Sequence, residues 1–571
     1  MPSQKPTISF ILFVFLAFFF FWDCSEPDKP NREGTTTLQD GSIPTIPESK
    51  EGSTQDDGGL QDKESLLEDK DPANRDRTPQ EPREATPNSE HKEFNSERLF
   101  PDSNHQIPES VQEQTSNLSS WVKHIERWHY SEGRDVAVDT QGNVYITGFF
   151  EKTAIFGSTT LTAPLRTDLP GYYDIFVAKL APNGKWLWAK RAGGFGDDDR
   201  GYSIAVDAKG GIIITGQFDE SADFGPFTLT RPKSLCGFIA KLNASGKWLW
   251  AERIESTELS SGDAVAIDSH NDILVTGHFY KTATFGKTTL TAKMLREIFV
   301  AKLDPNGKWL WAKSIGGPVR TRQPYNLATD AKDNVILIGS FYQSIQMGTI
   351  KLTAKANGDT FVAKLNSNGK WLWAKRSGGS PFAEHGSALA VDAQGNIFIT
   401  GQFLGTSDFG ATTFTSPKGG AGGAYQEIDI FVAKLDTNGK WLWAKRTYGT
   451  IKYPGGYNHY NEGRGITLDR SGNVYITGRF EEPTAFGHTT LKTSIDSDIF
   501  VAKLDGNGKW LWAKQAGSTK YNDWGSSIVV DMQGNIITTG QFGTPANFDG
   551  IKVTQTGSSH RAFVWKLRPK P

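Results

Sequence analysis

The side chains best suited to chemistry gather in one irregular stretch, TYGTIKYPGGYNHYNEG, at residues 447–463. Five of them combine a flat ring with a group that forms hydrogen bonds: Tyr448, Tyr453, Tyr457, His459 and Tyr460. Such side chains are common at binding surfaces, because they offer both apolar area and a polar tip. We therefore predict a ligand-binding loop here. The alternative is that these rings pack on a neighbouring loop.

Other reactive residue types form no recognisable chemical centre. Asp197, Asp198 and Asp199 are adjacent, and adjacent carboxylates rarely converge on one cation, so a solvated loop is favoured over a calcium site. No phosphate-binding loop, nucleophile elbow or zinc-protease motif is present, and no carboxylate pair stands out from the repeats described below. We predict no metal, no cofactor and no enzymatic activity.

Glu132-Gly-Arg134 and Glu462-Gly-Arg464 occupy the same place in two repeats. A motif that recurs at one place in the repeats is more typical of the scaffold than of a site. A structural salt bridge is therefore favoured over a site.

The N-terminus carries an export signal. Lys5 precedes an apolar run from Ile8 to Trp22, which is short for a membrane span and suits the core of a secretory signal. Cys24 follows at once, and the arrangement resembles a bacterial lipoprotein signal in which this cysteine becomes lipidated. The alternatives are an uncleaved signal anchor or ordinary cleavage nearby. We predict a signal peptide at 1–23 and attachment to the cell envelope, at the outer membrane or cell surface, through this anchor alone.

Residues 24–118 differ from the rest of the chain in composition. Pro, Glu, Asp, Ser, Thr and Gln dominate, and between residues 25 and 100 acidic side chains outnumber basic ones by 19 to 10. Such a segment cannot bury enough apolar surface to offset its conformational entropy. We predict a disordered linker. The whole chain has a net charge of only −2, which gives no indication of nucleic-acid binding.

From residue 119 to 571 the chain is a repeat array. Three phrases recur seven times in fixed order, for example DVAVDTQGN at 135–143, VYITG at 144–148 and FVAKL at 176–180. A fourth, KWLWA, occurs only six times and holds twelve of the 17 Trp residues. Each phrase alternates β-branched or aromatic residues and ends in turn residues, which predicts four antiparallel strands per unit, here called strands a, b, c and d.

Units of four short antiparallel strands predict a β-propeller with seven blades. Because Trp186 and Trp188 alternate with Leu187 and Ala189, we expect strand d to be apolar on both faces, with the Trp pair filling the gap between blades. The missing seventh copy of strand d is expected from SSWVK at 119–123. This N-terminal strand would complete the last blade and remove an open sheet edge.

The AVD-x-x-GN-VYITG and DIFVAKLD-x-NGKWLWAK phrases resemble those of the bacterial seven-bladed β-propeller (SBBP) repeat proteins. The resemblance covers residues from about 119 to 567. It implies a seven-bladed ring on an exported or envelope-attached protein, and it implies no reaction.

Strand alternation places the b–c and d–a loops on one face of the ring, here called the loop face. These loops are long and varied, whereas the a–b and c–d turns are short and uniform, so we expect recognition on the loop face. We predict a monomeric binding or structural module for a protein or glycan ligand. The alternatives are a carbohydrate lyase or hydrolase that uses the central channel, and a periplasmic assembly scaffold.

Overall fold

The computed structural model describes residues 119–571 apart from 127–128, 165–170, 195–197, 232–233, 320–325, 356–357, 380–383, 417, 420–424, 450–459, 494–495, 555–559 and 569–571. The predicted signal peptide, Cys24 and the linker lie outside the described residues, as do Tyr453, Tyr457 and His459. Within the described part, no helix has the length and apolar character needed to cross a membrane.

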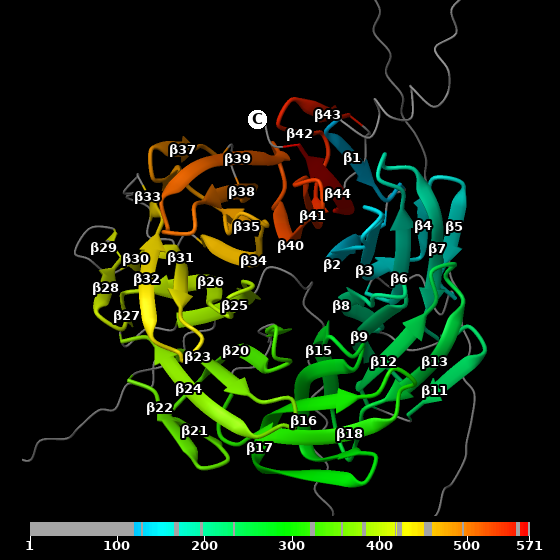
Figure 1. Cartoon of the computed structure of the whole chain (residues 1–571). Helices are drawn as coiled ribbons and strands as arrows, with labels where there is room; N and C mark the ends of the chain where they lie inside the picture. The colour runs from blue at the N-terminus through cyan, green and yellow to red at the C-terminus, as the bar shows by residue number, and fades with distance from the viewer. Residues whose placement is uncertain are drawn as a thin grey trace, which may run out of the picture. The chain divides into compact units, whose positions relative to one another are not determined.

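The described chain is an all-β propeller of antiparallel sheets (Figure 1). Each sequence repeat forms one sheet in the order a–b–c–d. Repeats 1 to 3 use β2 (Ser131–Val138), β3 (Val144–Glu151), β6 (Tyr173–Leu180), β7 (Trp186–Ala192); β8 (Arg200–Val206), β9 (Ile212–Phe218), β12 (Cys236–Leu242), β13 (Trp248–Arg253); and β15 (Ser260–Ile267), β16 (Ile273–Phe285), β17 (Thr288–Leu303), β18 (Trp309–Ile315).

Repeats 4 to 7 continue the same order around the ring. They use β19 (Asn326–Thr329), β20 (Val335–Phe341), β23 (Asp359–Leu365), β24 (Trp371–Ser377); β25 (Glu384–Val391), β26 (Ile397–Leu404), β31 (Ile428–Leu435), β32 (Trp441–Arg446); β34 (Glu462–Leu468), β35 (Val474–Phe480), β38 (Asp498–Leu504), β39 (Trp510–Ser518); and β40 (Trp524–Val530), β41 (Ile536–Phe542), β44 (Arg561–Leu567), β1 (Trp121–His124).

Short hairpins lie between strands b and c. They are β4 (Thr153–Phe156) with β5 (Thr159–Thr162), β10 (Ser221–Phe224) with β11 (Phe227–Thr230), β21 (Ser344–Met347) with β22 (Ile350–Thr353), β27 (Thr406–Phe409) with β28 (Thr412–Thr415), β36 (Thr484–Phe486) with β37 (Thr489–Leu491), and β42 (Ala546–Phe548) with β43 (Ile551–Val553). In repeat 3 the same hairpin is the continuous end of β16 and start of β17. Four two-residue strands complete the set: β14 (Glu255–Ser256), β29 (Lys418–Gly419), β30 (Tyr425–Gln426) and β33 (Tyr448–Gly449).

The predicted number of seven sheets is corrected by this pairing. Among the described residues eight sheets have three or more strands, because β33 joins the hairpin β36–β37 as a separate three-stranded sheet. The other seven contain the a–b–c–d order. The loop after strand d of repeat 5 creates the eighth sheet, since it carries Tyr448 and Gly449 alongside repeat 6.

The predicted closure by the N-terminus is confirmed. β1 pairs antiparallel with β44, and Trp121 faces Lys566 in the register. Each strand a contacts the strands a of its two neighbours, so these strands form the inner wall of the ring. The apolar clusters lie between adjacent sheets. The cluster between repeats 7 and 1, for example, joins Val564 of β44 to Phe156 and Val144.

The two tryptophans of each pair have different roles. The second crosses to the next repeat: Trp188 Nε1–H donates to the carbonyl of Ala244, 3.2 Å away in the following c–d turn. Five others repeat this bond, namely Trp121, Trp250, Trp311, Trp373 and Trp443. The first stays in its own repeat, where Trp186 meets the edge of Phe156 with ring centres 5.1 Å apart.

The expectation that strand d packs on both faces is confirmed, but the two tryptophans do not share one face as predicted: Trp186 packs in the cluster between repeats 7 and 1, and Trp188 in the cluster between repeats 1 and 2. Leu187, between the two tryptophans, is 47% exposed, and its counterparts in the other copies are exposed to a similar degree. The register shifts between Lys179 and Leu180, which lie opposite Trp188 and Trp186, so Leu187 is an extra, bulged residue that is left exposed. The predicted filling of the gap between neighbouring sheets holds for the second tryptophan of the pair.

Candidate functional site

The site begins with a local irregularity in strand a. In β2 the register shifts between Gly133 and Asp135, so Arg134 is an extra, bulged residue. A bulge re-aims side chains at the place where it occurs. Five other strands a have the same shift, and the bulged residues of the six are Arg134, Tyr202, Asp263, Ser387, Arg464 and Ser526.

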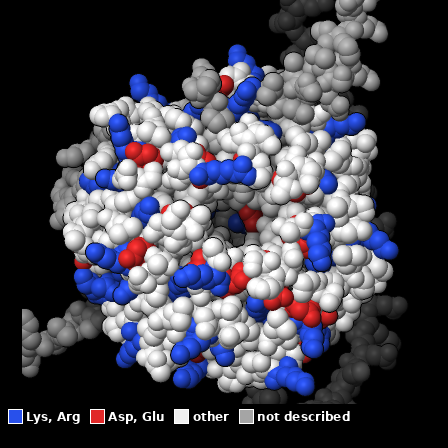
Figure 2. Space-filling model, viewed as in Figure 1, with Lys and Arg blue, Asp and Glu red and all other residues white. Residues whose placement is uncertain are grey.

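Glycine is required beside each bulge because two chains approach closely. A Cβ on Gly133 would overlap the side chain of Thr539 in the neighbouring repeat, and one on Gly148 would overlap the carbonyl of Glu132. The scaffold is therefore uniform, while the bulged residues differ chemically from repeat to repeat. Figure 2 shows the ring hollowed at its centre, with acidic and basic side chains around the opening.

Repeats 7 and 1 bring together an aromatic and acidic group. Glu132 has no exposed surface, and one of its oxygens accepts from Trp524 Nε1–H at 3.2 Å. The Tyr130 hydroxyl donates to Gln541 Oε1 at 2.6 Å and lies 3.2 Å from Glu132 Oε2. The His560 ring lies against Tyr130, with centres 5.9 Å apart. These side chains come from opposite ends of the propeller sequence and meet only because the ring closes.

Arg134 connects this group to repeat 2. Its Nε lies 3.1 Å from Glu132 Oε1, and its side chain keeps 27% of its surface exposed. The guanidinium also lies over the rings of Phe149 and Tyr202, 5.2 and 5.8 Å from their centres. We call Tyr130, Glu132, Arg134, Tyr202, Trp524 and His560 the axial cluster.

Burial sets the protonation of this cluster. Burial, and then the neighbouring Glu132 carboxylate, raise the pKa of the Tyr130 phenol well above its usual value. Burial also raises the pKa of Tyr202 and lowers that of His560 below its usual value. Both phenols and the imidazole are therefore neutral at neutral pH, and each can donate or accept a proton.

Two further arginines lie next to the axial cluster, in repeat 6. Burial favours the neutral form of Glu462, but Arg464 and Arg479 outweigh it and lower the pKa of this carboxyl. Arg464 Nε is 2.8 Å from Glu462 Oε2, and its guanidinium lies 4.9 Å from the centre of Trp524. The predicted salt bridges within the two Glu-Gly-Arg triplets are thus both present.

The residues predicted as a site lie elsewhere. Tyr448 is 49% exposed on β33, with the Arg446 guanidinium 4.3 Å from its ring centre. Tyr460 is half-buried, and its backbone N–H donates to Glu481 Oε2 at 2.8 Å. The structure does not join these two rings in one cluster. The described part of the loop therefore leaves its binding role a prediction.

The aspartate run also departs from expectation. Asp199 is completely buried, and its carboxylate accepts the N–H groups of Gly194 and Asp219 at 2.9 Å each. Asp198 pairs with Arg200 at 2.6 Å. The prediction of a solvated loop is thus wrong for these two residues, because they hold the chain between repeats 1 and 2. Asp197 lies outside the described residues.

The sequence contains a signal for the axial cluster that motif searching misses. The residues on either side of one glycine in strand a read E-G-R, R-G-Y, S-G-D, H-G-S, E-G-R and W-G-S in the six described bulges. Variation at a fixed position in nearly uniform repeats marks positions that the scaffold leaves free. Tyr130 and His560 have no such signal, since they lie in irregular segments.

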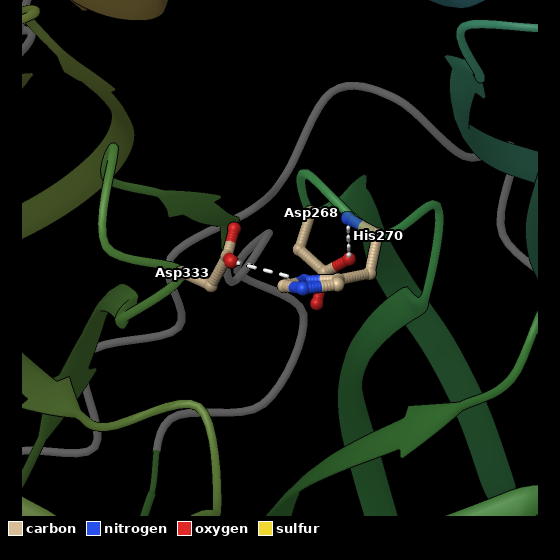
Figure 3. A group of neighbouring side chains, drawn as sticks. All are labelled: Asp268, His270 and Asp333. Atoms are coloured by element: carbon tan, nitrogen blue, oxygen red, sulfur yellow. Dashed lines mark hydrogen bonds and ion pairs between the residues drawn. The ribbon is translucent and has the colours of Figure 1, made fainter.

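One group on the opposite face has the composition of a metal site. Asp268, His270 and Asp333 come together between repeats 3 and 4, with His270 Nδ1 3.2 Å from Asp333 Oδ2 (Figure 3). Asp268 already has a cationic partner, however, because Lys302 Nζ lies 2.7 Å from its Oδ2. Equivalent Asp–Lys pairs recur in other repeats, such as Asp330–Lys364. We therefore interpret these three side chains as stabilising the a–b turns of repeats 3 and 4.

Comparisons with known proteins give a fold and no family. No protein-family model matches the chain. An uncharacterized WD repeat-containing protein, L264, of Acanthamoeba polyphaga mimivirus is 24% identical over 438 residues, which is 63% of this chain and 31% of that protein. The chain thus spans about a third of the relative's length. The resemblance to SBBP repeat proteins stays a hypothesis.

Similar solved structures include two polysaccharide lyases and a gluconolactonase. A PL25 ulvan lyase bound to a GlcA(1-4)Rha3S sugar is 13% identical, with 73% of this chain and 93% of that chain covered and a TM-score of 0.39. The polysaccharide lyase Uly1 is 8% identical, with coverage of 76% and 89% and a TM-score of 0.37. The gluconolactonase XC5397 of Xanthomonas campestris is 14% identical, with coverage of 64% and 89% and a TM-score of 0.28.

These comparisons correct the prediction that the chain is not an enzyme. That prediction came from the absence of a linear motif, and similar folds include enzymes of at least two kinds. In a ring of repeats, reactive side chains come from several sheets and leave no motif. The likeness itself shows the fold alone and transfers no activity to this chain.

Proposed function

We propose that the axial cluster binds an acidic glycan chain and cleaves it by β-elimination. The observation that carries the proposal is the chemical difference among the bulged residues, which gathers Arg134, Tyr202 and Arg464 on one arc of the inner wall. Guanidinium groups pair with carboxylate or sulfate groups, and aromatic rings pack on sugar faces. A ring of uniform repeats has no structural need for such an arc.

β-Elimination from a uronic acid needs three groups. A cation must stabilise the carboxylate as the C5 proton leaves, a base must accept that proton, and an acid must protonate the departing O4. Arg134 supplies the partly exposed cation. The neutral His560 imidazole is suited to accept the proton and the neutral Tyr130 phenol to donate one. The C5–H and C4–O bonds break, and a C4=C5 double bond forms.

The test uses the purified full chain and polymers that contain uronic acids, with neutral polymers of the same size as controls. We expect binding of the acidic polymers and release of products that carry the ultraviolet absorbance of an unsaturated uronate. Tyr130→Phe should lower turnover by at least tenfold with little loss of binding. Arg134→Ala should weaken binding. Arg253→Ala, an exposed arginine away from the axis, is the matched control. Absence of binding to every acidic polymer would refute the proposal.

A binding role without turnover on the loop face is the second candidate. The exposed Tyr448 ring, held under Arg446, supports it. A glycan array on the full chain separates the two candidates. Tyr448→Ala should abolish binding if the loop carries recognition, and it should leave the axial activity unchanged. Retained binding in this variant would overturn the second candidate.

We also propose that residues 1–23 direct export and that Cys24 carries a lipid anchoring a monomeric protein to the cell envelope. The apolar run followed directly by cysteine supports this proposal. Mass spectrometry of the mature N-terminus tests it. Unmodified cysteine, or a mature chain that starts beyond it, would refute lipidation.

A further inference from the structure

A buried ion pair recurs between strands c and d and provides an internal comparison. In three repeats an aspartate at the start of strand c pairs with an arginine seventeen residues later on strand d. The separation of the charged atoms is 2.7 Å for Asp359–Arg376 and 2.9 Å for Asp429–Arg446. The third pair is Asp174–Arg191.

Repeat 6 has the aspartate of this ion pair but not the arginine. Asp498 begins β38 and is only 4% exposed. The residue opposite Phe500 is Gln515, whereas Arg446 is opposite Phe431 in repeat 5. The Gln515 amide bonds to the backbone of Lys492, donating at 3.0 Å and accepting at 3.2 Å.

A second buried carboxylate lies near Asp498 and further disfavours the charged form of Asp498. Asp523 is completely buried, and its oxygens accept the backbone N–H groups of Ser518 and Gly543. Burial and then Asp523 raise the pKa of Asp498 to about 8. Among the described residues the Asp498 carboxylate has no hydrogen-bond or ion-pair partner. An unpartnered buried carboxylate is expensive, and proteins usually provide such a group with a partner.

Repeat 3 shows how the chain solves the same problem elsewhere. Ser314 stands there at the position of the arginine, opposite Phe299. Its acid, Glu297, has the longer side chain and accepts the backbone N–H of Lys293 at 2.8 Å. Asp359 accepts the equivalent N–H of Lys355 in addition to its arginine, so the acid of repeat 3 retains one of these two partners, whereas the described residues of repeat 6 supply neither to Asp498.

The unpartnered carboxylate opens onto a groove. A hollow of about 770 Å³ runs along β39 between the hairpins of repeats 6 and 7, and Asp498 is part of its lining. Leu491 and Trp512 contribute apolar surface. Lys514 also lines the groove, but its ammonium is paired with Asp549. This volume lies within the range of about 300–1,000 Å³ that is typical of ligand sites.

We propose that this groove binds the guanidinium group of an arginine side chain, which takes the place of the missing arginine and pairs with Asp498. The three sibling pairs show which cation this position accommodates. The apolar side chain of Leu491 in the lining suits the aliphatic stem of such a cation. A calcium ion would require about six to eight oxygen ligands, and the Asp523 oxygens are already used by backbone N–H groups. The inference is independent of the axial cluster.

The experiment titrates the full chain with N-acetyl-arginine methylamide by calorimetry. The lysine and citrulline analogues and calcium chloride are titrated in parallel. We expect saturable binding of the arginine compound, at least tenfold weaker binding of the citrulline analogue because it has no charge, and no competition by calcium. An extended peptide with a central arginine separates the sources: tighter binding than the single residue indicates a protein partner, and equal binding indicates the free amino acid.

Two variants locate the site. Asp498→Asn should abolish binding by removing the partner. Gln515→Arg should abolish it by occupying the position from within, and it should also raise the melting temperature. Ser314→Arg, the same change in repeat 3, is the matched control and should leave binding unchanged. The proposal is overturned if arginine does not bind, if both groove variants bind normally, or if calcium displaces the arginine compound.

Discussion

Repeats 1 and 7 have the same four strands, but the strands of repeat 7 come from two separate parts of the sequence. Repeat 1 is continuous, and its strand d carries both tryptophans. Repeat 7 takes strand d from the N-terminus, which supplies Trp121 and has Ser119 where the first tryptophan would stand. Strand c of repeat 7 compensates: Trp565 replaces the alanine of other repeats and packs on Phe548, with ring centres 5.5 Å apart.

In both repeats a tryptophan packs against a phenylalanine of the hairpin between strands b and c. The tryptophan comes from strand d in repeat 1 and from strand c in repeat 7. Trp186 reaches Phe156 from strand d, and Trp565 reaches Phe548 from strand c. Trp565 has no exposed surface, whereas Trp186 is half-buried. Moving the tryptophan from one strand to the other therefore requires the strand c and strand d positions to be substituted together.

The largest expected effect comes from removing β1. Deleting residues 119–126 leaves the outer edge of β44 unpaired and removes Trp121 from the cluster between repeats 7 and 1. We expect loss of the cooperative thermal transition, or a melting temperature lower by many degrees. Deletion of residues 2–110 is the control and should leave the transition in place. A normal transition without 119–126 would contradict closure by the N-terminal strand.

The next effect separates the two ways of filling a sheet. Trp565→Ala should lower the free energy of unfolding by about 3–5 kcal/mol, because it leaves a cavity at a fully buried position. Trp186→Ala should cost less, since its ring is half-buried. Chemical denaturation measures both. Equal losses of unfolding free energy in the two variants would show that the burial of the tryptophan does not determine its contribution to stability.

The third expected effect is on the pH dependence of stability, and it compares the buried Glu384 of repeat 5 with the exposed Glu255. Burial raises the pKa of Glu384 from 4.5 to about 8. The folded state then holds a proton that the unfolded state releases, so the contribution of Glu384 to stability is greatest below pH 4.5 and is lost as the pH rises to about 8. Each pH unit is worth up to about 1.4 kcal/mol. Glu384→Gln should flatten this fall in denaturation curves, and Glu255→Gln, which is exposed, should not.

A smaller effect tests the bond between repeats. Trp188→Phe keeps an aromatic ring and removes the N–H that donates to Ala244. We expect a loss of about 1 kcal/mol, the usual net value of one hydrogen bond. Loss of hydrogen-exchange protection at the start of strand d in repeat 1, with little change in repeat 4, would locate the effect. Unchanged stability would mean that water replaces the bond without cost.

The smallest effect concerns the residue between the tryptophans. Leu187→Gln should change the free energy of unfolding by less than about 0.5 kcal/mol, since that side chain is 47% exposed. Loss of more than about 1 kcal/mol would show that the side chain of this bulged residue is packed and not exposed. Ala189→Gln, on a buried neighbour, is the destabilising control.

The sequence by itself determined the strands, their order and the closure of the ring. Strand alternation and Asn-Gly turns are local properties, and the mismatch between six copies of KWLWA and seven of FVAKL or its variants FIAKL and FVWKL leaves one strand to be supplied by Trp121. Only the tertiary structure showed that strand d bulges at Leu187. Strict alternation would put both tryptophans on one face, whereas the bulge turns Trp186 and Trp188 to opposite faces and leaves Leu187 exposed.

The candidate site depended on the tertiary structure for the same reason. Tyr130 and His560 are 430 positions apart in the sequence, and their rings lie 5.9 Å apart because β1 and β44 join. No local pattern encodes that distance. Asp498 teaches a similar lesson: the sequence shows Gln515 where other repeats have arginine, but only burial shows that the remaining carboxylate has lost its partner. Local patterns specify elements, and desolvation between elements specifies sites.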